Sequence, residues 1–299
     1  MSKISTTLRG SIFGILGAAA YGTNPLFALP LYDRGMNTDS LLFYRYFFAL
    51  LMMGGFMLLR RKSFRVESGR QMGLLAVGGG LLVFSSITLF AAFKCMDSGL
   101  AATILFVYPL MVCAIMYLGF GVKQSPLTLV GLVVAVGGIF LLSNGGNGGQ
   151  VTPIGILSVC LSSLLYAIYM VMLKVTSIKN LTSENLTFYS LLFSIPYFLI
   201  ILKGGTALQP LPDLFSLSCT LGLAVFPSFC SFLFMAIAIK DIGPTKTAIL
   251  GALEPVTALM FGITCFGESL SPLQIVAIAL IIGSVIMVVT AKPPTQREK

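Results

Sequence analysis

The sequence predicts an all-α membrane protein with ten transmembrane helices in two inverted five-helix repeats. Three observations lead to this fold class: a very hydrophobic composition, ten apolar runs with brief connections, and similarity between the two halves of the chain. Hydrophobic residues make up 57% of the 299 residues, and Asp, Glu, Lys and Arg make up 10%. Soluble domains average about 45–50% and about 25%. Such a chain cannot present a polar surface to water.

The composition also excludes other classes. Disorder requires low hydrophobicity and high charge, and the six cysteines occur singly, without a Cys-x-x-Cys motif. The chain has no His and no closely spaced acidic pair in an apolar run, so we expect no metal and no cofactor. The net charge of +9 gathers partly at Arg60, Arg61, Lys62, Arg65 and Arg70. Because apolar runs flank this loop, we interpret it as membrane-flanking and expect no nucleic-acid partner.

Ten apolar runs define the predicted spans. A bilayer core of about 30 Å takes about 20 residues as a helix. The first run lacks a cleavage pattern after a short core, so we interpret it as a retained span and not as a signal peptide. The predicted spans lie near 10–31, 41–59, 72–93, 99–120, 127–142, 154–173, 186–202, 215–238, 247–266 and 273–291.

The basic residues orient these spans. With the N-terminus inside, 15 of the 19 Lys and Arg residues fall on inner segments and 3 on outer segments, while Arg45 falls within a span. Basic residues of short loops are retained on the cytoplasmic side. We therefore expect a multi-pass protein of the cell membrane with both termini cytoplasmic.

The two halves of the chain match at two neighbouring offsets. At an offset of 145, DSLLFYRYFF from Asp39 matches ENLTFYSLLF from Glu184. At 146, FGVKQSPL from Phe120 matches FGESLSPL from Phe266. The matches stay collinear over about 115 residues, as expected of an internal repeat.

Five spans in each repeat give the two repeats opposite orientations, because five is odd. We place the first repeat at residues 1–146 and the second at 147–299. Inverted repeats are the architecture of secondary transporters, in which a site at the repeat interface opens alternately to either side.

Two segments resemble a known family. AATILFVYPLMVCAIMYLGF and TAILGALEPVTALMFGITCFGESLSPLQIVAIALIIGSVIMVV are similar to the fourth-to-fifth and ninth-to-tenth helices of the EamA family, in the drug/metabolite transporter superfamily. The resemblance covers nearly the whole chain, including FYRYFFA around Arg45, although Val122 stands where the second repeat has Glu268. It implies a ten-helix exporter of small metabolites such as amino acids or drugs, and it does not fix the substrate.

Glu254 is the first candidate for substrate binding. An ionisable side chain deep in a bilayer is costly and therefore a functional candidate. Pro255 follows it directly and removes a backbone hydrogen bond, so a carboxylate beside a broken helix is available to bind a substrate amine or a proton. A protonated Glu bonded to a neighbouring helix is the alternative. The repeat counterpart is Tyr108, before Pro109.

Arg45 is the second charged candidate, as a peripheral member of the cavity. It lies about five residues inside the outer end of its span. Snorkelling to the outer headgroups, or pairing with Asp33 or Asp39, is an equally good interpretation.

Polar residues on the first, third, sixth and eighth spans complete the predicted cavity. Tyr21 and Asn24 are three apart on one helical face, and the repeat places Tyr166 and Tyr169 on the equivalent face. Ser85 and Ser231 occupy corresponding positions. For each set, ordinary helix packing is the alternative. We expect hinges or kinks at Pro109, Pro255 and Pro25, and we interpret Ser271 with Gln274 as a cap of the last helix.

The function expected from these features is export of a small organic metabolite by alternating access, and its coupling is either to protons through Glu254 or absent. The partners are then a small-molecule substrate and the lipid bilayer, and the protein is a monomer or homodimer. The predicted spans lack the residues that an intramembrane enzyme needs, because they contain no His and no second deep carboxylate. A non-transporting scaffold or accessory subunit, and an uptake carrier of the same fold, stay open.

Overall fold

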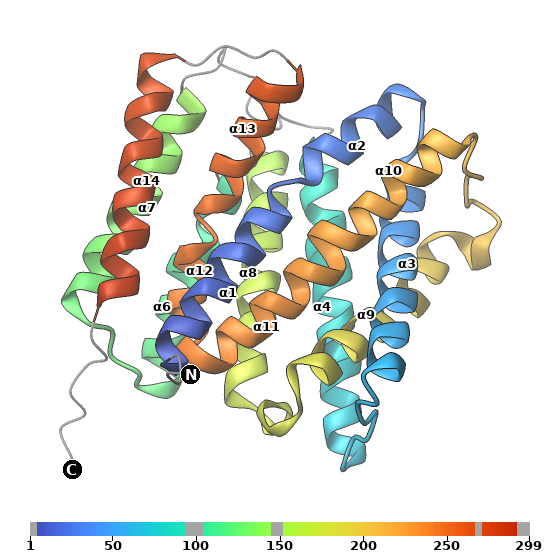
Figure 1. Cartoon of the computed structure of the whole chain (residues 1–299), viewed down its shortest axis with the longest axis horizontal. Helices are drawn as coiled ribbons and strands as arrows, with labels where there is room; N and C mark the ends of the chain where they lie inside the picture. Colours follow the sequence, from blue (N-terminus) through green and yellow to red (C-terminus); the bar gives the residue numbers. More distant parts are fainter. Residues whose placement is uncertain (1–4, 94–103, 145–151, 267–270, 292–299) are drawn as a thin grey trace.

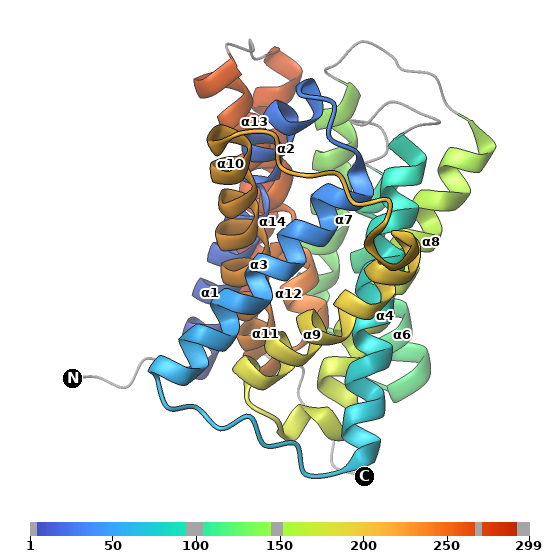
Figure 2. The ribbon, with the colours of Figure 1, turned by 90° about the vertical axis from the view of Figure 1, so that its right-hand side faces the viewer.

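The structure is a computed structural model that describes residues 5–93, 104–144, 152–266 and 271–291. These residues form a bundle of helices and contain no strand (Figures 1 and 2). Eight helical segments of this part are long and apolar enough to cross a membrane. The predicted all-α, multi-pass membrane protein is therefore confirmed.

The helical regions follow the ten predicted spans. Eight spans coincide with the eight long segments, and the fourth and fifth coincide with shorter apolar helices at Tyr108–Phe120 and Pro126–Leu141. The beginning of the fourth span lies outside the described residues, as do Lys94 and Glu268. Ten complete spans and the inverted arrangement stay predictions.

The elements, in chain order, are α1 Thr6–Tyr21, α2 Asn24–Asp33, α3 Thr38–Leu59, α4 Gly69–Phe93, α6 Tyr108–Phe120, α7 Pro126–Asn144, α8 Pro153–Val175, η1 Ser177–Asn180, α9 Ser183–Ile201, η2 Lys203–Gly205, α10 Leu214–Ala224, η3 Val225–Cys230, α11 Ser231–Ile242, α12 Pro244–Leu250, α13 Leu253–Phe266 and α14 Pro272–Thr290. The predicted cap of the last helix is confirmed. Ser271 accepts from the backbone N–H of Gln274, whose side chain accepts in return from the backbone N–H of Ser271.

Three helix pairs make the most extensive contacts in the bundle. These pairs are α7 with α14, α1 with α11, and α4 with α8; α7 and α14 run side by side at the left of Figure 1. Glycines permit such close approach. A Cβ on Gly79 of α4 would lie 2.8 Å from the backbone carbon of Phe193 of α9, so the backbones are nearly in contact there.

Three of the predicted spans are interrupted helices. The first consists of α1 and α2, which are separated by a turn at Gly22 and Thr23, and the ninth consists of α12 and α13, separated by a turn at 251–252. The eighth passes from α10 through the single π-helical turn η3 into α11. Irregular backbone is tolerated inside a membrane protein only where it is buried or lines a cavity.

Two of the prolines predicted to bend the chain, Pro25 and Pro255, lie at these interruptions, and Pro109 follows a further turn, at 106–107 in the fourth span. Pro25, Pro109 and Pro255 each fall in the first turn of a helix that resumes after a turn, where a missing N–H has no helical partner to lose. One prediction is wrong as a result. Tyr21 and Asn24 do not share a face of one continuous helix, because Tyr21 ends α1 and Asn24 begins α2. They still touch, since Asn24 Nδ2 donates to the backbone oxygen of Tyr21 at 2.9 Å.

One end of the bundle carries a set of basic side chains. α1 begins there and α14 ends there, at the lower end in Figure 1. We define this basic end by the residues whose ammonium or guanidinium groups bond to a carboxylate or a backbone carbonyl there, namely Arg9, Lys62, Lys174, Lys240 and Lys246.

Candidate substrate cavity

A small cavity lies inside the bundle, where α1, α4, α6, α8 and α13 meet. Its volume is about 40 Å³, which is enough for water but too small for a metabolite. One carboxylate, four phenol rings and three serine hydroxyls contribute to its wall, together with apolar side chains. The lining residues are Tyr21, Tyr46, Leu82, Ser85, Ser86, Leu89, Leu105, Tyr108, Ser162, Tyr166, Phe232 and Glu254.

Glu254 and Tyr108 meet at this cavity from the two halves of the chain. Each lies in the first turn of a helix that resumes after a break. The Tyr108 hydroxyl donates to the backbone oxygen of Ala248 at 3.1 Å. Gly251 makes the approach feasible, because a Cβ there would lie 2.0 Å from Tyr108 Oη and 3.4 Å from Glu254 Oε1. The predicted pair across the repeats is therefore in proximity.

The tyrosines on α8 extend the aromatic wall. The ring of Tyr166 packs edge-on against that of Tyr108, with centroids 5.1 Å apart, and stacks on Tyr169 at 6.3 Å. Tyr166 lines the cavity. Tyr169 does not, because its hydroxyl turns away to donate to Ser190 Oγ of α9 at 3.2 Å.

Two serines join α4 to α8 beside the cavity. Ser162 Oγ donates to the backbone oxygen of Ser85 at 2.7 Å, and Ser85 Oγ donates to the backbone oxygen of Ser162 at 3.0 Å. Both hydroxyls are therefore engaged in hydrogen bonds that link α4 to α8. Ser231, the repeat counterpart of Ser85, is buried at the beginning of α11 and does not line the cavity.

Arg45 turns into the bundle and does not reach the outer surface. Its side chain, on a residue only 4% exposed, donates to Ser228 Oγ at 2.6 Å, to the Pro227 carbonyl at 3.1 Å and to Asn24 Oδ1 at 3.0 Å. It forms no ion pair with Asp33 or Asp39. The snorkelling and surface-pairing interpretation of Arg45 is therefore wrong. The π-helical turn supplies the reason, because it presents the Pro227 carbonyl and Ser228 to a buried donor.

The guanidinium of Arg45 lies behind the cavity wall. It is 5.3 Å from the ring centroid of Tyr21, 5.8 Å from that of Tyr46 and 6.0 Å from that of Phe232, and all three rings line the cavity. Arg45 is thus a peripheral member, separated from the cavity by aromatic rings.

Arg45 and Glu254 form no ion pair with any of the described residues. The ion pairs among the described residues are Arg9 with Asp241, Arg34 with Asp213, and Lys62 with Glu184, so neither residue takes part in one. Within the same residues, no group of three or more His, Cys, Asp or Glu side chains lies together as a metal site would require. Arg45 is buried and Glu254 is partly buried, and an ionisable group without an ion pair inside a membrane helix is costly and is a sign of function.

The structure brings together most of the predicted site. Glu254, Tyr108, Tyr21, Tyr166 and Ser85 line one cavity. Asn24 contacts Arg45 behind it, and Tyr169 and Ser231 pack elsewhere. The part of these residues in binding stays a prediction.

Ser162, Tyr46 and Phe232 are among the lining residues that were not singled out in the sequence. Ser162 lies one helical turn before Tyr166, so the helical periodicity that selected Tyr166 also points to it. Tyr46 and Phe232 lie on α3 and α11 among many aromatic residues, and no pattern separates them from lipid-facing or packing rings.

A polytopic helical bundle with interrupted spans and an interior polar cavity defines the class of membrane transporters. The profile of the EamA-like transporter family matches residues 8–144 and again residues 153–290. The chain therefore belongs to the EamA-like transporter family, as its sequence motifs indicated.

Curated relatives carry transporter names. A protein of Archaeoglobus fulgidus named "Uncharacterized transporter" is 28% identical over 285 residues, covering 91% of this chain and 93% of its own. A protein of Escherichia coli K12 named "Uncharacterized inner membrane transporter YedA" is 26% identical over 220 residues, covering 73% of this chain and 69% of its own. A protein of Bacillus subtilis named "Uncharacterized transporter YcbK" is 25% identical over 301 residues, covering 97% of this chain and 94% of its own. Family and names imply a transporter and not an enzyme.

The fold also resembles a solved one. A crystal structure of a protein with 18% sequence identity superposes with a TM-score of 0.77 and covers 93% of this chain and 95% of that chain. At this identity the likeness concerns the fold alone. The chain is a multi-pass membrane protein of a transporter family.

Proposed function

We propose that this protein is a secondary transporter that exports a small organic metabolite, amino-acid-like or drug-like, across the cytoplasmic membrane by alternating access. The observation that carries the proposal is the cavity at Glu254, where a carboxylate with no bonded partner among the described residues lies beside a broken helix inside the bundle. An ionisable side chain inside a membrane protein costs free energy, and this cost is tolerated when the group binds a substrate.

An inverted repeat is part of the proposal, with residues 1–146 as one unit and 147–299 as the other. The two separate family matches support this division. The contacts support it too. Exchanging the repeats converts the pair formed by the first and eighth spans into the pair formed by the sixth and third, and these are α1 with α11 and α8 with α4, two of the three most extensive pairs.

The substrate class follows from the charges around the cavity. Glu254 favours an amino group, and the four tyrosine rings offer π faces to the same cation. Arg45 lies behind Tyr21 with N–H groups beyond the three that are bonded. A substrate with a carboxylate as well as an amine, such as an amino acid, compensates both charges once the cavity widens and the rings between Arg45 and the cavity move aside.

The small cavity corresponds to a conformation that holds no metabolite. Widening must therefore accompany binding, and the interrupted spans at Pro25, Pro109 and Pro255 are the places where helix halves can tilt. Glu254 is the carboxylate in the cavity wall, so protons are the coupling ion we propose. The basic end faces the cytoplasm in this scheme, with both chain termini, because basic loops are retained there.

The experiment is a comparison of metabolites in the medium of cells that express the wild type, Glu254→Gln, Glu67→Gln or no transporter. Glu67 lies in an exposed loop and serves as the matched carboxylate control. We expect a few compounds to accumulate outside with the wild type and Glu67→Gln, and to fall to the empty-cell level with Glu254→Gln.

Other outcomes decide against parts of the proposal. Export by both wild type and Glu254→Gln removes Glu254 from the pathway. Depletion of compounds from the medium identifies an uptake carrier. No change in the medium, with the protein confirmed in the membrane, contradicts export and favours a non-transporting accessory subunit.

A further inference from the structure

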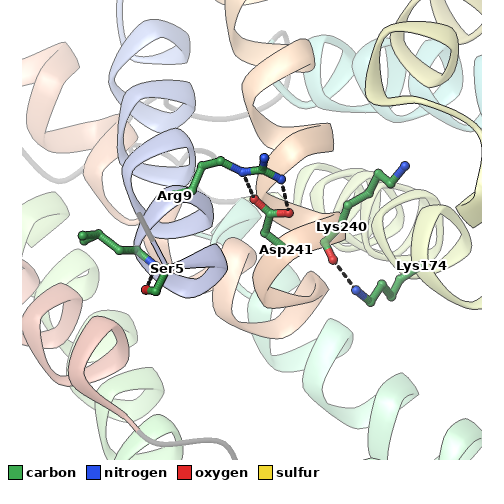
Figure 3. Close-up of polar contacts among 6 residues, drawn as sticks. Ser5, Arg9, Lys174, Lys240 and Asp241 are labelled. Atoms are coloured by element: carbon green, nitrogen blue, oxygen red, sulfur yellow. Dashed lines mark hydrogen bonds and ion pairs between the residues drawn. The ribbon is translucent and has the colours of Figure 1, made fainter. Parts of the chain in front are cut away.

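Arg9 and Asp241 close the basic end of the α1–α11 pair. Figure 3 shows the guanidinium of Arg9, on α1, bonded to the carboxylate of Asp241, near the end of α11. Nε donates to Oδ2 and Nη2 to Oδ1, each at 2.8 Å. Such a two-pronged pair is directional and stronger than a single contact. The Asp241 side chain is 7% exposed and that of Arg9 is 56% exposed, so the carboxylate is inside the seam and the cation covers it.

Close backbone contact accompanies the ion pair. Gly10 follows Arg9, and a Cβ on Gly10 would lie 2.6 Å from the Cβ of Asp241. One turn further along α1, a Cβ on Gly14 would lie 2.7 Å from Leu250 Cδ1 of α12. α1 is therefore tightly packed at the site of the pair, and separation of α1 from α11 must break the pair.

Neighbouring lysines attach the same end of α11 to other helices. Lys174 of α8 donates to the backbone oxygen of Lys240, as Figure 3 shows. Lys240 in turn donates to the backbone oxygen of Leu181, after η1. Cations at helix carboxyl ends are favourable because unpaired carbonyls gather there. The end of α11 is thus held from two sides.

The repeat has no equivalent of this ion pair. At the offsets that relate the two halves, Arg9 corresponds to Ile154 and Asp241 to Cys95. An isoleucine and a cysteine cannot form an ion pair. Two otherwise similar helix pairs, α1 with α11 and α8 with α4, therefore differ in charge at equivalent positions.

We propose that Arg9 and Asp241 form a one-sided latch, which shuts the basic end of the cavity and sets the resting conformation of the carrier. This inference rests on the proposed alternating access. In a symmetric scaffold the two open states have similar energies, so an ion pair that the equivalent positions of the other helix pair cannot form shifts the population toward the state in which the basic end is closed.

The test measures opening directly and needs no substrate. Ala238 of α11 is fully buried and faces Gly14 of α1, at 3.6 Å from a Cβ built there. A cysteine at this position, in a background whose native cysteines are replaced by serine, reports opening through its rate of alkylation by a polar maleimide in detergent. Detergent exposes both ends of the protein to the reagent.

We expect Arg9→Gln and Asp241→Asn each to raise the alkylation rate roughly two- to fivefold, the scale of a partly exposed ion pair. The double variant gives no more than either single one, because both remove the same interaction. Arg9→Lys, which keeps the charge and loses the second prong, lies between. Arg34→Gln breaks an exposed pair with Asp213 elsewhere and leaves the rate unchanged. High salt raises the wild-type rate and not that of the double variant.

Equal alkylation of Asp241→Asn and the parent, or additive effects of the two single variants, would overturn the latch. If the cysteine-replaced background does not fold, hydrogen exchange of residues 6–14 and 236–242 in the otherwise native chain replaces the alkylation. Faster exchange in Asp241→Asn supports the latch and unchanged exchange contradicts it. A failure of transport is seen separately, in the metabolites of the medium.

Discussion

The breaks before α6 and before α13 each contain a tight turn, and they differ in the side chain that they present to the cavity. Before α6, the N–H of Val107 donates to the Ile104 carbonyl at 3.0 Å, and before α13 the N–H of Ala252 donates to the Ile249 carbonyl at 3.0 Å. The first break places Tyr108 in the cavity wall with its hydroxyl bonded. The second places Glu254 there with a carboxylate that has no hydrogen-bond or ion-pair partner among the described residues.

The repeated turn belongs to the scaffold of the fold, whereas the side chain that it presents determines the chemistry. A repeated proline and turn produce the same interruption twice, and the side chain one residue before the proline decides whether that interruption carries a charge. A neutral phenol completes its hydrogen bond within the protein. The carboxylate of Glu254 has no such partner among the described residues, and we therefore propose that the second break carries the chemistry.

The largest effect is expected from Gly251→Ala, which breaks the contact between the two interruptions. The added Cβ would lie 2.0 Å from Tyr108 Oη and 2.9 Å from the Ala248 carbonyl, so Tyr108 must leave its place. Overpacking of this kind costs about 3 kcal/mol. We expect a lower melting temperature and loss of export. Gly283→Ala is the control, because a Cβ at Gly283 meets nothing within 4 Å.

Arg45→Lys extends the comparison to the breaks of the first and eighth spans. Lysine keeps the charge but cannot reach Asn24, Pro227 and Ser228 in the planar geometry of the guanidinium. We expect a loss of about 2 kcal/mol, since hydrogen bonds from charged groups are worth about 1.5–3 kcal/mol. Thermal melting measures it. A melting temperature equal to that of the wild type would show that Arg45 does not hold these breaks together.

Tyr108→Phe tests the break before α6, which presents a neutral side chain to the cavity. Removal of the hydroxyl deletes one hydrogen bond to Ala248 and leaves the ring contact with Tyr166. We expect a cost of about 1 kcal/mol with export largely retained, measured by melting and by export rate. Export lost completely, as in Glu254→Gln, would give the two breaks equal roles.

Asp213 is the reference for a carboxylate outside the membrane and should show the smallest effect. Ser216 donates to this carboxylate at the beginning of α10 and lowers its pKa below the usual value. Because the folded pKa is the lower one, the contribution of Asp213 is present above about pH 3.9 and is lost as the pH falls through the folded pKa. In Asp213→Asn the neutral amide oxygen still caps the helix, so we expect a slightly smaller drop in melting temperature between pH 7 and pH 3.

Apolar patterning and prolines predicted much of this molecule. All ten predicted spans coincide with helical regions, and Pro25, Pro109 and Pro255 lie at real interruptions. Glu254 and Tyr108 were paired from the repeat alone, and they share a cavity.

The remaining features of the site could not be predicted because the sequence does not show in which direction a side chain points. Arg45 lies near a span end, where snorkelling is usual, and the π-helical turn that draws it inward has no sequence signature beyond Pro227. Tyr46 and Phe232 enter the cavity wall from aromatic-rich helices in which the sequence does not distinguish an inward ring from an outward one.

The most direct test of the account is the export rate of the compound named by the medium comparison, measured in proteoliposomes with wild type, Glu254→Gln and Glu67→Gln at equal protein content and with melting temperatures recorded. The account predicts that Glu254→Gln melts like the wild type and loses at least tenfold in rate, about 1.4 kcal/mol, while Glu67→Gln is unchanged. A wild-type rate in Glu254→Gln would contradict the central claim that this carboxylate lies on the transport pathway.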